Sequence, residues 1–283
     1  MTAELSVVRA GALTTVQDLG RPGYAHLGVP RSGALDAPAL SRANALVGNS
    51  SGAAGLETTL TGCAFRLVSG GVVAVTGAAA RVRVDGVPVD LDVPVSVPAG
   101  GLVDVGRATA GVRSYVAVAG GLAVPPVLGS RSTDTLSGLG PPRVRDGDRL
   151  PLGPVLSGPG TASFQPASGG EVHLPVRLGP RDGWFTAAAV ETLLTTAYTV
   201  SPNSNRVGVR LSGAALTRAD AFELPSEGVV LGAVQVPADG QPLVFLADHP
   251  TTGGYPVIAV VTDVTALAQA RPGSTVRFHG PER

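Results

Sequence analysis

The chain has 283 residues, of which 44% are hydrophobic, and a mean hydropathy of +0.28, values typical of a folded globular protein. Its 21 basic residues balance its 21 acidic residues, so no global field attracts nucleic acid or an anionic membrane. The sequence contains no lysine, which excludes a Walker A phosphate loop, a Schiff-base lysine and a biotinylated lysine on this chain.

The N-terminal segment carries an acid early and lacks the basic-then-apolar pattern of an export signal. No uninterrupted apolar run reaches the length of a spanning helix. The single cysteine, Cys63, excludes an intrachain disulfide and fits a reducing compartment. We therefore expect a cytoplasmic protein that binds neither nucleic acid nor membrane.

Short Val-rich runs separated by Gly and Pro recur along the chain and predict mostly β structure. The alternating segment 81–91 surrounds Asp85-Gly86, the strongest hairpin signal in the sequence. Further strands are expected within residues 65–77, 113–120, 172–178, 243–247 and 274–280.

A first helix is expected after Asp36, a suitable N-cap, with Gly48 as its stop signal. Its apolar stripe includes Leu40 and Ala43, and Asn44 falls on the same face. A second helix is expected at about residues 186–197. A third begins near Asp263 and is stopped by Pro272-Gly273.

Few helices among many strands indicate a closed β architecture, a barrel or a sandwich, with helices covering its open ends. The best linker candidate is residues 151–170, which are rich in Gly, Pro and Ser. We therefore expect an N-terminal β domain over residues 1–155 and a C-terminal β domain over residues 156–283, which can exchange segments.

Several common kinds of site have no support in the sequence. The four histidines do not pair with one another or with Cys63 at metal-ligand spacing, so no dedicated metal site is predicted. The G-x-S-x-G nucleophile elbow and the dinucleotide glycine fingerprint are both absent.

Four polar loops punctuated by glycine remain as candidate sites. The first, residues 17–36, is held by internal hydrogen bonds, binds a ligand, or both. In it, Asp18 can anchor Arg21 or cap a turn, and Arg21 and Tyr24 are candidates for ligand contact. The second loop, residues 120–140, contains the run Ser130–Thr133, which suits either an anion or a solvated surface loop.

The third loop, residues 200–213, places Arg206 among short polar residues. Its planar fork can take a carboxylate or phosphate, or it can form a structural salt bridge. The fourth loop, residues 248–257, reads "DHPTTGGYPV". Its two glycines can adopt conformations closed to other residues and expose N–H groups to a ligand, or they can form a tight turn satisfied by Asp248.

Motifs running in order from about residue 14 to residue 278 carry a family resemblance. They read "QDLGRPGY", "GVPRSGALD", "ANALVGN", "LETTLTG", "GGLAVPPVLGSRST", "LPSEGVVLGAVQVPADGQPLVFLAD", "TTGGYPVIAVV" and "LAQARPGSTVRF". With them the chain resembles the KipA-like proteins, the family of 5-oxoprolinase C subunits, historically called allophanate hydrolase subunit 2.

The resemblance implies two cyclophilin-like β-barrel domains. It also implies membership of an ATP-dependent 5-oxoprolinase complex, which uses ATP with Mg to phosphorylate the lactam of 5-oxo-L-proline and hydrolyse it to L-glutamate. The implied partners are a KipI-like B subunit and a lactam-hydrolase-like A subunit.

The resemblance also implies roles for residues within the matching motifs. An arginine cluster of Arg21, Arg131 and Arg206 would neutralise charge, with Asp18 or Asp248 as a metal ligand or base. The expected catalytic residues are Asp18, Arg21, Arg206 and Asp248. The expected substrate-binding residues are Tyr24, Ser32, Asn44, Arg131, Thr251, Thr252, Gly253, Gly254 and Tyr255.

Two other functions stay open for such a chain. One is a carboxyltransferase component of a urea carboxylase or allophanate hydrolase system, with biotin on another chain because this one lacks lysine. The other is a non-catalytic regulator that binds a KipI-like inhibitor of a sensor kinase.

The sequence departs from the family pattern at three places. His249 and Pro250 replace the usual Arg-Gln before Thr-Thr-Gly-Gly. Asn205 and Val207 replace the acid and methionine of the usual Ser-Asp-Arg-Met-Gly, and Arg181 replaces the glutamine of Gly-Pro-Gln. These changes make a shifted substrate an open possibility.

Overall fold

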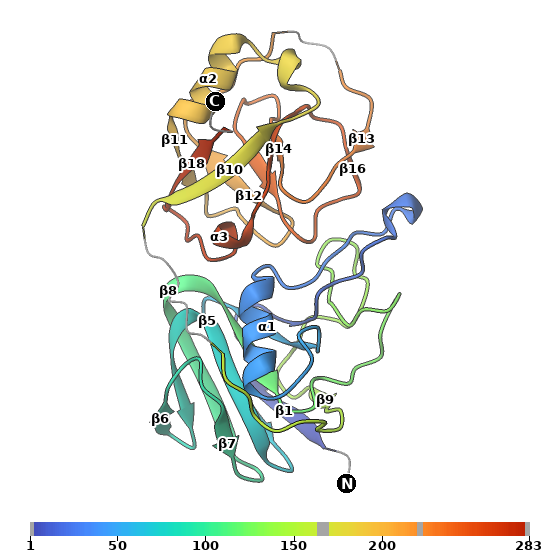
Figure 1. Ribbon diagram of the computed structural model, residues 1–283, viewed down its shortest axis with the longest axis vertical. Helices are drawn as coiled ribbons and strands as arrows, with labels where there is room; N and C mark the ends of the chain where they lie inside the picture. The colour runs from blue at the N-terminus through green and yellow to red at the C-terminus, as the bar shows by residue number, and fades with distance from the viewer. Residues whose placement is uncertain (1–2, 163–169, 220–222, 281–283) are drawn as a thin grey trace. The chain divides into compact units, whose positions relative to one another are not determined.

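The computed structural model describes residues 3–162, 170–219 and 223–280, and the chain forms two compact units (Figure 1). Unit 1 comprises Met1–Arg21, Ser32–Asp134 and Gly138–Gly169. Unit 2 comprises Pro22–Arg31, Thr135–Ser137 and Gly170–Arg283. Two short segments from the first half of the sequence therefore belong to unit 2. The domain boundary expected between residues 155 and 156 stays a prediction, and residues 163–169 of the expected linker lie outside the described residues.

Unit 1 is built on one nine-stranded sheet, in which β2, β3, β8, β4, β1 and β9 follow one another and β5 pairs with β6, β7 and β8. The long strands β5 and β8 pair with three register shifts, which mark bulges. The strands are β1 (Glu4–Arg9), β2 (Thr14–Gln17), β3 (Gly55–Thr59), β4 (Cys63–Leu67), β5 (Gly71–Val84), β6 (Val87–Val89), β7 (Val95–Val97), β8 (Leu102–Val118) and β9 (Arg149–Pro151).

The predicted hairpin and first helix are both confirmed in unit 1. The turn between β5 and β6 is Asp85-Gly86, with φ of 48° and 83°, the left-handed pair that a type I′ turn requires. Helix α1 (Ala37–Leu46) begins after Asp36, whose carboxylate accepts a hydrogen bond from the Ala39 amide at 3.0 Å. Its apolar face packs on the sheet, where Ala43 and Leu46 share a buried cluster with Ala74 and Ala117.

Unit 2 contains a closed seven-stranded barrel in the order β10-β17-β14-β15-β12-β11-β18, closed by the parallel pair β10 and β18. A separate two-stranded sheet joins β13 and β16. The strands are β10 (Val172–Leu178), β11 (Ala197–Val200), β12 (Gly208–Ser212), β13 (Glu227–Gly228), β14 (Ala233–Gln235), β15 (Leu243–Phe245), β16 (Thr252–Gly253), β17 (Val257–Val261) and β18 (Thr275–His279).

The helices of unit 2 are short. Helix α2 (Ala187–Thr195) starts after Thr186, whose hydroxyl accepts from the Ala189 amide at 3.1 Å, as a capping residue does. The third predicted helix is a single turn, α3 (Thr265–Ala268). The Asp263 carboxylate accepts from the Thr265 amide at 2.9 Å, and Gly273, with a positive φ, follows the helix. Two 3-10 turns are η1 (Ala25–Leu27) and η2 (Asp182–Trp184).

The predicted fold class, mostly β with a few helices, is confirmed. One of the two expected barrels is the closed barrel of unit 2, and unit 1 presents its nine strands as a single sheet. Within the described residues, no helix has both the length and the apolar character needed to cross a membrane.

The Asp36 cap gives a first test of this local structure. Replacing Asp36 with Ala removes an acceptor for a helix N–H, so we expect the free energy of unfolding to fall by about 1 kcal/mol in urea titrations. Asp90→Ala is the control, since Asp90 is exposed, and should change it by less than about 0.5 kcal/mol. Equal effects of the two substitutions would contradict the capping role.

Cys63 gives a second test. It opens β4, is 2% exposed, and burial raises the pKa of its thiol to about 12. Since the thiolate is the reactive form, we expect the folded protein to resist a thiol reagent at mildly alkaline pH and to react after denaturation. Rapid modification without unfolding would show that the thiol is accessible.

Candidate functional site

In unit 1 the carboxylate of Asp18, directly after β2, gathers hydrogen bonds from the loop at residues 130–132. Its Oδ1 accepts from the hydroxyls of Ser130 and Ser132, both at 2.6 Å, and from the Gly20 amide at 2.8 Å. Its Oδ2 accepts from the Arg131 amide at 2.6 Å. The carboxylate therefore fixes the run of donors that the sequence singled out, and holds it beside β2.

Arg21 is buried, with 2% of its surface exposed, and binds backbone of the same loop. Its Nη2 donates to the Ser132 carbonyl and its Nε to the Val127 carbonyl at 3.3 Å. Its Nη1 has no hydrogen-bond partner, and among the described residues no carboxylate forms an ion pair with this guanidinium. A buried cation without a counter-charge is costly, so this side chain is suited to an anion supplied from outside the chain.

Two more buried polar atoms lie on the same segments without a partner among the described residues. They are Oε1 of Gln17 and Oγ1 of Thr133. The Thr133 carbonyl in turn accepts from Gln17 Nε2 at 2.9 Å and from the Ser32 hydroxyl at 3.0 Å. Because buried polar groups are nearly always hydrogen-bonded, this cluster marks a place where water or ligand atoms complete the bonding.

Close packing at one glycine supports the same loop. A Cβ added at Gly140 would lie 2.0 Å from the Ser132 carbonyl oxygen and 3.0 Å from Nη2 of Arg21. Gly140 also has a φ of +83°, which disfavours other residues. The arginine is therefore enclosed by backbone that leaves no room for a side chain.

Two other residues expected at the site, Asn44 and Arg131, bind the chain itself. The Asn44 amide is buried, donates to the Ala53 carbonyl at 2.8 Å and accepts from Asn49 at 3.0 Å, which ties down the turn after α1. The guanidinium of Arg131 donates from Nε to the Val124 carbonyl at 2.7 Å. Their substrate-binding roles stay predictions.

The sequence reading missed a buried network around Glu57 in β3. Its Oε2 accepts from the Tyr115 hydroxyl at 2.9 Å and from the Leu35 amide at 3.0 Å. The same hydroxyl accepts from the Asp36 amide at 2.8 Å, and burial, followed by the nearby Glu57 charge, raises the pKa of Tyr115. A charged residue within a short strand whose neighbours carry no charge is the signal that would have revealed this anchor for the start of α1.

In unit 2 Arg206 and Asp248 form a buried bidentate ion pair, with 1% and 0% of the two side chains exposed. Nε and Nη2 of the arginine each lie 2.9 Å from a different carboxylate oxygen. The Thr135 amide and hydroxyl donate to Oδ2 of Asp248 at 2.9 and 2.7 Å. Of the two alternatives predicted for Arg206, the structure shows the salt bridge. Through Thr135, the Asp248 carboxylate of this pair also holds the segment Thr135–Ser137 in unit 2.

The charge state of Asp248 follows from these contacts. Burial alone raises the pKa of the carboxyl, but the Arg206 charge, with the hydrogen bonds from Arg206 and Thr135, outweighs burial and holds the pKa below its usual value. Asp248 is therefore ionised at neutral pH.

The Thr-Thr-Gly-Gly loop, residues 251–254, is held as a short strand. Thr252 and Gly253 form β16 and pair with β13, and the Thr251 carbonyl accepts from the Val229 amide at 3.0 Å. The expected glycine conformations are absent, since neither Gly253 nor Gly254 lies in the left-handed region. Gly253 instead packs against the Gln235 side chain, whose Nε2 atom would lie 2.4 Å from a Cβ at this position.

Two tyrosines lie at the ends of unit 2 loops. Tyr255 is 46% exposed, with the Arg218 guanidinium 5.9 Å from its ring centre, and its carbonyl accepts from Gln235 at 3.0 Å. Tyr24 precedes η1, and its carbonyl accepts from the Leu27 amide at 2.9 Å. Tyr255 therefore presents an open ring beside a cation, whereas the contacts of Tyr24 are made by its backbone.

The positions that depart from the family pattern have local partners. The Nδ1 atom of His249 lies 2.6 Å from the Pro250 carbonyl oxygen. The Asn205 side chain accepts from the Val207 amide at 2.8 Å, as a turn-forming residue does. Arg181 binds Glu227 of β13 at 2.8 Å.

The structure thus brings Asp18, Arg21, Ser32 and Arg131 to one loop system in unit 1, and Arg206 and Asp248 together in unit 2. Their catalytic and substrate-binding roles stay predictions, as do those of residues 251–255. Ser130, Ser132 and Thr135 are additional members, and the density of hydroxyls in the second loop was the signal for the first two.

The carboxylates that the structure describes do not gather into a magnesium site. No group of three His, Cys, Asp or Glu side chains within the described residues could hold a metal ion. The oxygens of Asp18 and Asp248 are already used by donors of the protein. Neither carboxylate therefore has the geometry of a metal ligand here.

A nine-stranded sheet unit and a closed barrel unit, each with buried charges holding polar loops, define a two-unit β protein. The model of the family described as "Carboxyltransferase domain, subdomain A and B" matches residues 27–280. The chain therefore belongs to this carboxyltransferase-domain family.

Similar proteins include 5-oxoprolinase C subunits and a urea amidolyase. The chain is 41% identical to the C subunit of 5-oxoprolinase from Escherichia coli, covering 97% of this chain and 90% of that protein. It is 32% identical to the corresponding 5-oxoprolinase C subunit from Haemophilus influenzae over the same shares. The crystal structure of the Kluyveromyces lactis urea amidolyase matches with a TM-score of 0.92 and 30% identity, over 98% of this chain and 18% of that one.

The ion pair of unit 2 gives a third test. Asp248→Asn removes the carboxylate charge that faces the buried Arg206, so we expect the free energy of unfolding at neutral pH to fall by about 3–5 kcal/mol. Because folding lowers the Asp248 pKa below 3.8, its stabilisation is present above that pH and is lost as pH falls through the folded-state pKa.

The difference in stability between wild type and Asp248→Asn should therefore narrow below about pH 4, in urea titrations run from neutral pH to about pH 3. Asp239→Asn is the matched control, since Asp239 is exposed and Asn can still accept from the Gln241 amide. A difference that stays constant over this range would contradict the assignment.

Proposed function

We propose that this chain is the C subunit of a 5-oxoprolinase, which opens 5-oxo-L-proline to L-glutamate in an ATP-dependent reaction. The 41% identity to the Escherichia coli protein, over nearly the whole of both chains, supports this function over the alternatives. The proposed partners are a KipI-like B subunit and a lactam-hydrolase-like A subunit. Catalysis belongs to this complex.

The observation that supports a role for this chain in substrate binding is the buried Arg21 guanidinium, whose Nη1 has no hydrogen-bond partner among the described residues. The substrate has one carboxylate, and activation of its lactam oxygen develops phosphoryl charge. A guanidinium in a dry site binds either group by charge-assisted hydrogen bonds. Arg21 therefore acts as the anion-binding residue, and Asp18 positions the loop that encloses it.

The buried pair in unit 2 has a different proposed role. The charges of Arg206 and Asp248 already neutralise each other. The two residues therefore position the segment that begins with Thr135. The loop 251–255 contributes backbone groups and the open ring of Tyr255 to substrate binding. ATP and its magnesium ion are assigned to the complex, because among the described residues no group of carboxylates gathers into a site for the metal.

The second candidate is a carboxyltransferase component acting on urea or a related amide. It is supported by the match to the urea amidolyase structure, of which this chain spans 18%. Biotin would then sit on another chain, since this sequence has no lysine. The third candidate, a regulator that binds a KipI-like kinase inhibitor, is favoured by no observation beyond the family resemblance.

The test is 5-oxoproline-dependent ATP hydrolysis by the three purified proteins of the complex. Activity is expected with wild type, and Arg21→Met should lower kcat/KM for 5-oxoproline by about 10²-fold, chiefly through KM, because a donor to the substrate anion is lost. Arg21→Lys should recover part of it. Arg210→Ala, at an exposed strand arginine, is the matched control and should leave activity unchanged.

Urea titrations of each variant separate lost function from lost folding, since Arg21 also binds two carbonyls. Absence of activity in the wild-type complex would refute the 5-oxoprolinase function. Full activity of a folded Arg21→Met complex would refute the role of Arg21 alone. Biotin-dependent carboxyl transfer to urea would establish the second candidate instead.

A further inference from the structure

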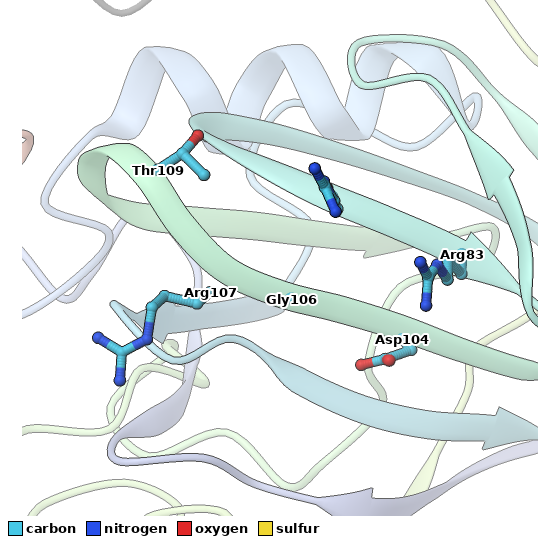
Figure 2. A pocket seen from close by; sticks show the side chains of 6 residues that line it. Arg83, Asp104, Gly106, Arg107 and Thr109 are labelled. Carbon is cyan, nitrogen blue, oxygen red and sulfur yellow. The ribbon is translucent and has the colours of Figure 1, made fainter.

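An arginine-lined groove lies on β5 and β8 in unit 1, apart from the polar loops described above (Figure 2). It has a volume of about 340 Å³ and is lined by Arg81, Arg83, Asp104, Gly106, Arg107 and Thr109. Arg81 and Arg83 alternate along β5 with the buried Val82 and Val84, so both arginines project from the same outer face of the sheet.

The charges in this groove do not cancel. Arg83 lies opposite Asp104 in the strand register, but the Asp104 carboxylate pairs with Arg9 at 2.6 Å. Within the described part of the chain, Arg81, Arg83 and Arg107 form no ion pair. The chain as a whole is electrically balanced, so three uncompensated guanidinium groups in one groove form a local positive site.

Gly106 adds no side chain to the lining of the groove. It packs closely on β5, since a Cβ there would lie 3.1 Å from the Arg81 carbonyl oxygen. The register shifts of the β5–β8 pair lie between Gly77 and Val82, next to Arg81. Bulges of this kind change the direction of side chains on a strand and recur beside binding sites.

We propose that this groove binds the phosphate group of a small molecule, either free phosphate or the phosphates of a nucleotide. Guanidinium forks match the paired oxygens of phosphate, and several of them on one face offset the charge of a dianion. The Thr109 hydroxyl donates to the Ala79 carbonyl at 3.1 Å, so the arginines carry the recognition. The proposal does not depend on the 5-oxoprolinase function and concerns the isolated chain.

The test is isothermal titration calorimetry of the full chain with inorganic phosphate and, separately, with ADP. Saturable binding is expected for wild type, and R81A/R83A should weaken it by about tenfold or more, since two charge-assisted contacts are lost. R81K/R83K keeps the charge without the forks and should bind between these limits. R177A/R210A removes two exposed strand arginines of the barrel in unit 2 and should bind like wild type.

Tighter binding of ADP than of phosphate would identify a nucleotide as the ligand, and weaker binding of ADP would identify free phosphate. Equal binding would show that the groove recognises the phosphate group alone. The proposal is overturned if wild type binds neither probe. It is also overturned if R81A/R83A, with an unchanged circular dichroism spectrum, binds as tightly as R177A/R210A.

Discussion

The constraint on which both units depend is that a buried carboxylate must have its oxygens hydrogen-bonded. Asp18, Glu57 and Asp248 have such carboxylates, and these residues are 7%, 1% and 0% exposed. Asp18 and Asp248 follow the strands β2 and β15, and Glu57 lies within β3. Each collects donors from residues distant in sequence: Ser130 and Ser132 for Asp18, Tyr115 and Leu35 for Glu57, and Thr135 for Asp248. Because an unmade bond at such a group costs a large share of total stability, these acids order loops that the strands alone would leave free.

The two buried arginines differ in what balances them. Arg206 has its counter-charge within the chain and is a structural cation, bound in bidentate fashion to Asp248. Arg21 is equally enclosed but is bound by two carbonyl groups, with one nitrogen left over. The two arginines are similarly buried, but of the two only Arg206 forms an ion pair with a carboxylate of the described residues. Arg206 therefore stabilises the fold, whereas Arg21 is suited to an anion from outside the chain.

The glycine-rich loop differs in backbone conformation from what its two glycines predict. Thr252 and Gly253 form a short strand paired with β13, and the Gln235 side chain lies where a Cβ at Gly253 would be. The Arg181–Glu227 pair reaches the same small sheet, so one of the departures from the family pattern lies next to this loop. The surroundings of this loop are therefore formed by residues from other parts of the chain, such as Arg181, Glu227 and Gln235.

The sequence by itself determined the elements whose signals are local: the capped helix after Asp36, the hairpin at Asp85-Gly86 and the predominance of short strands. The spacing of apolar residues and the residue types that favour turns act over a few positions along the chain, so these elements can be predicted without knowing the fold. Tertiary structure decided the partners of each buried charge. The salt bridge of Arg206, the surroundings of Arg21 and the anchor at Glu57 are made with residues 22 to 111 positions away. No short-range pattern in the sequence encodes contacts over such distances.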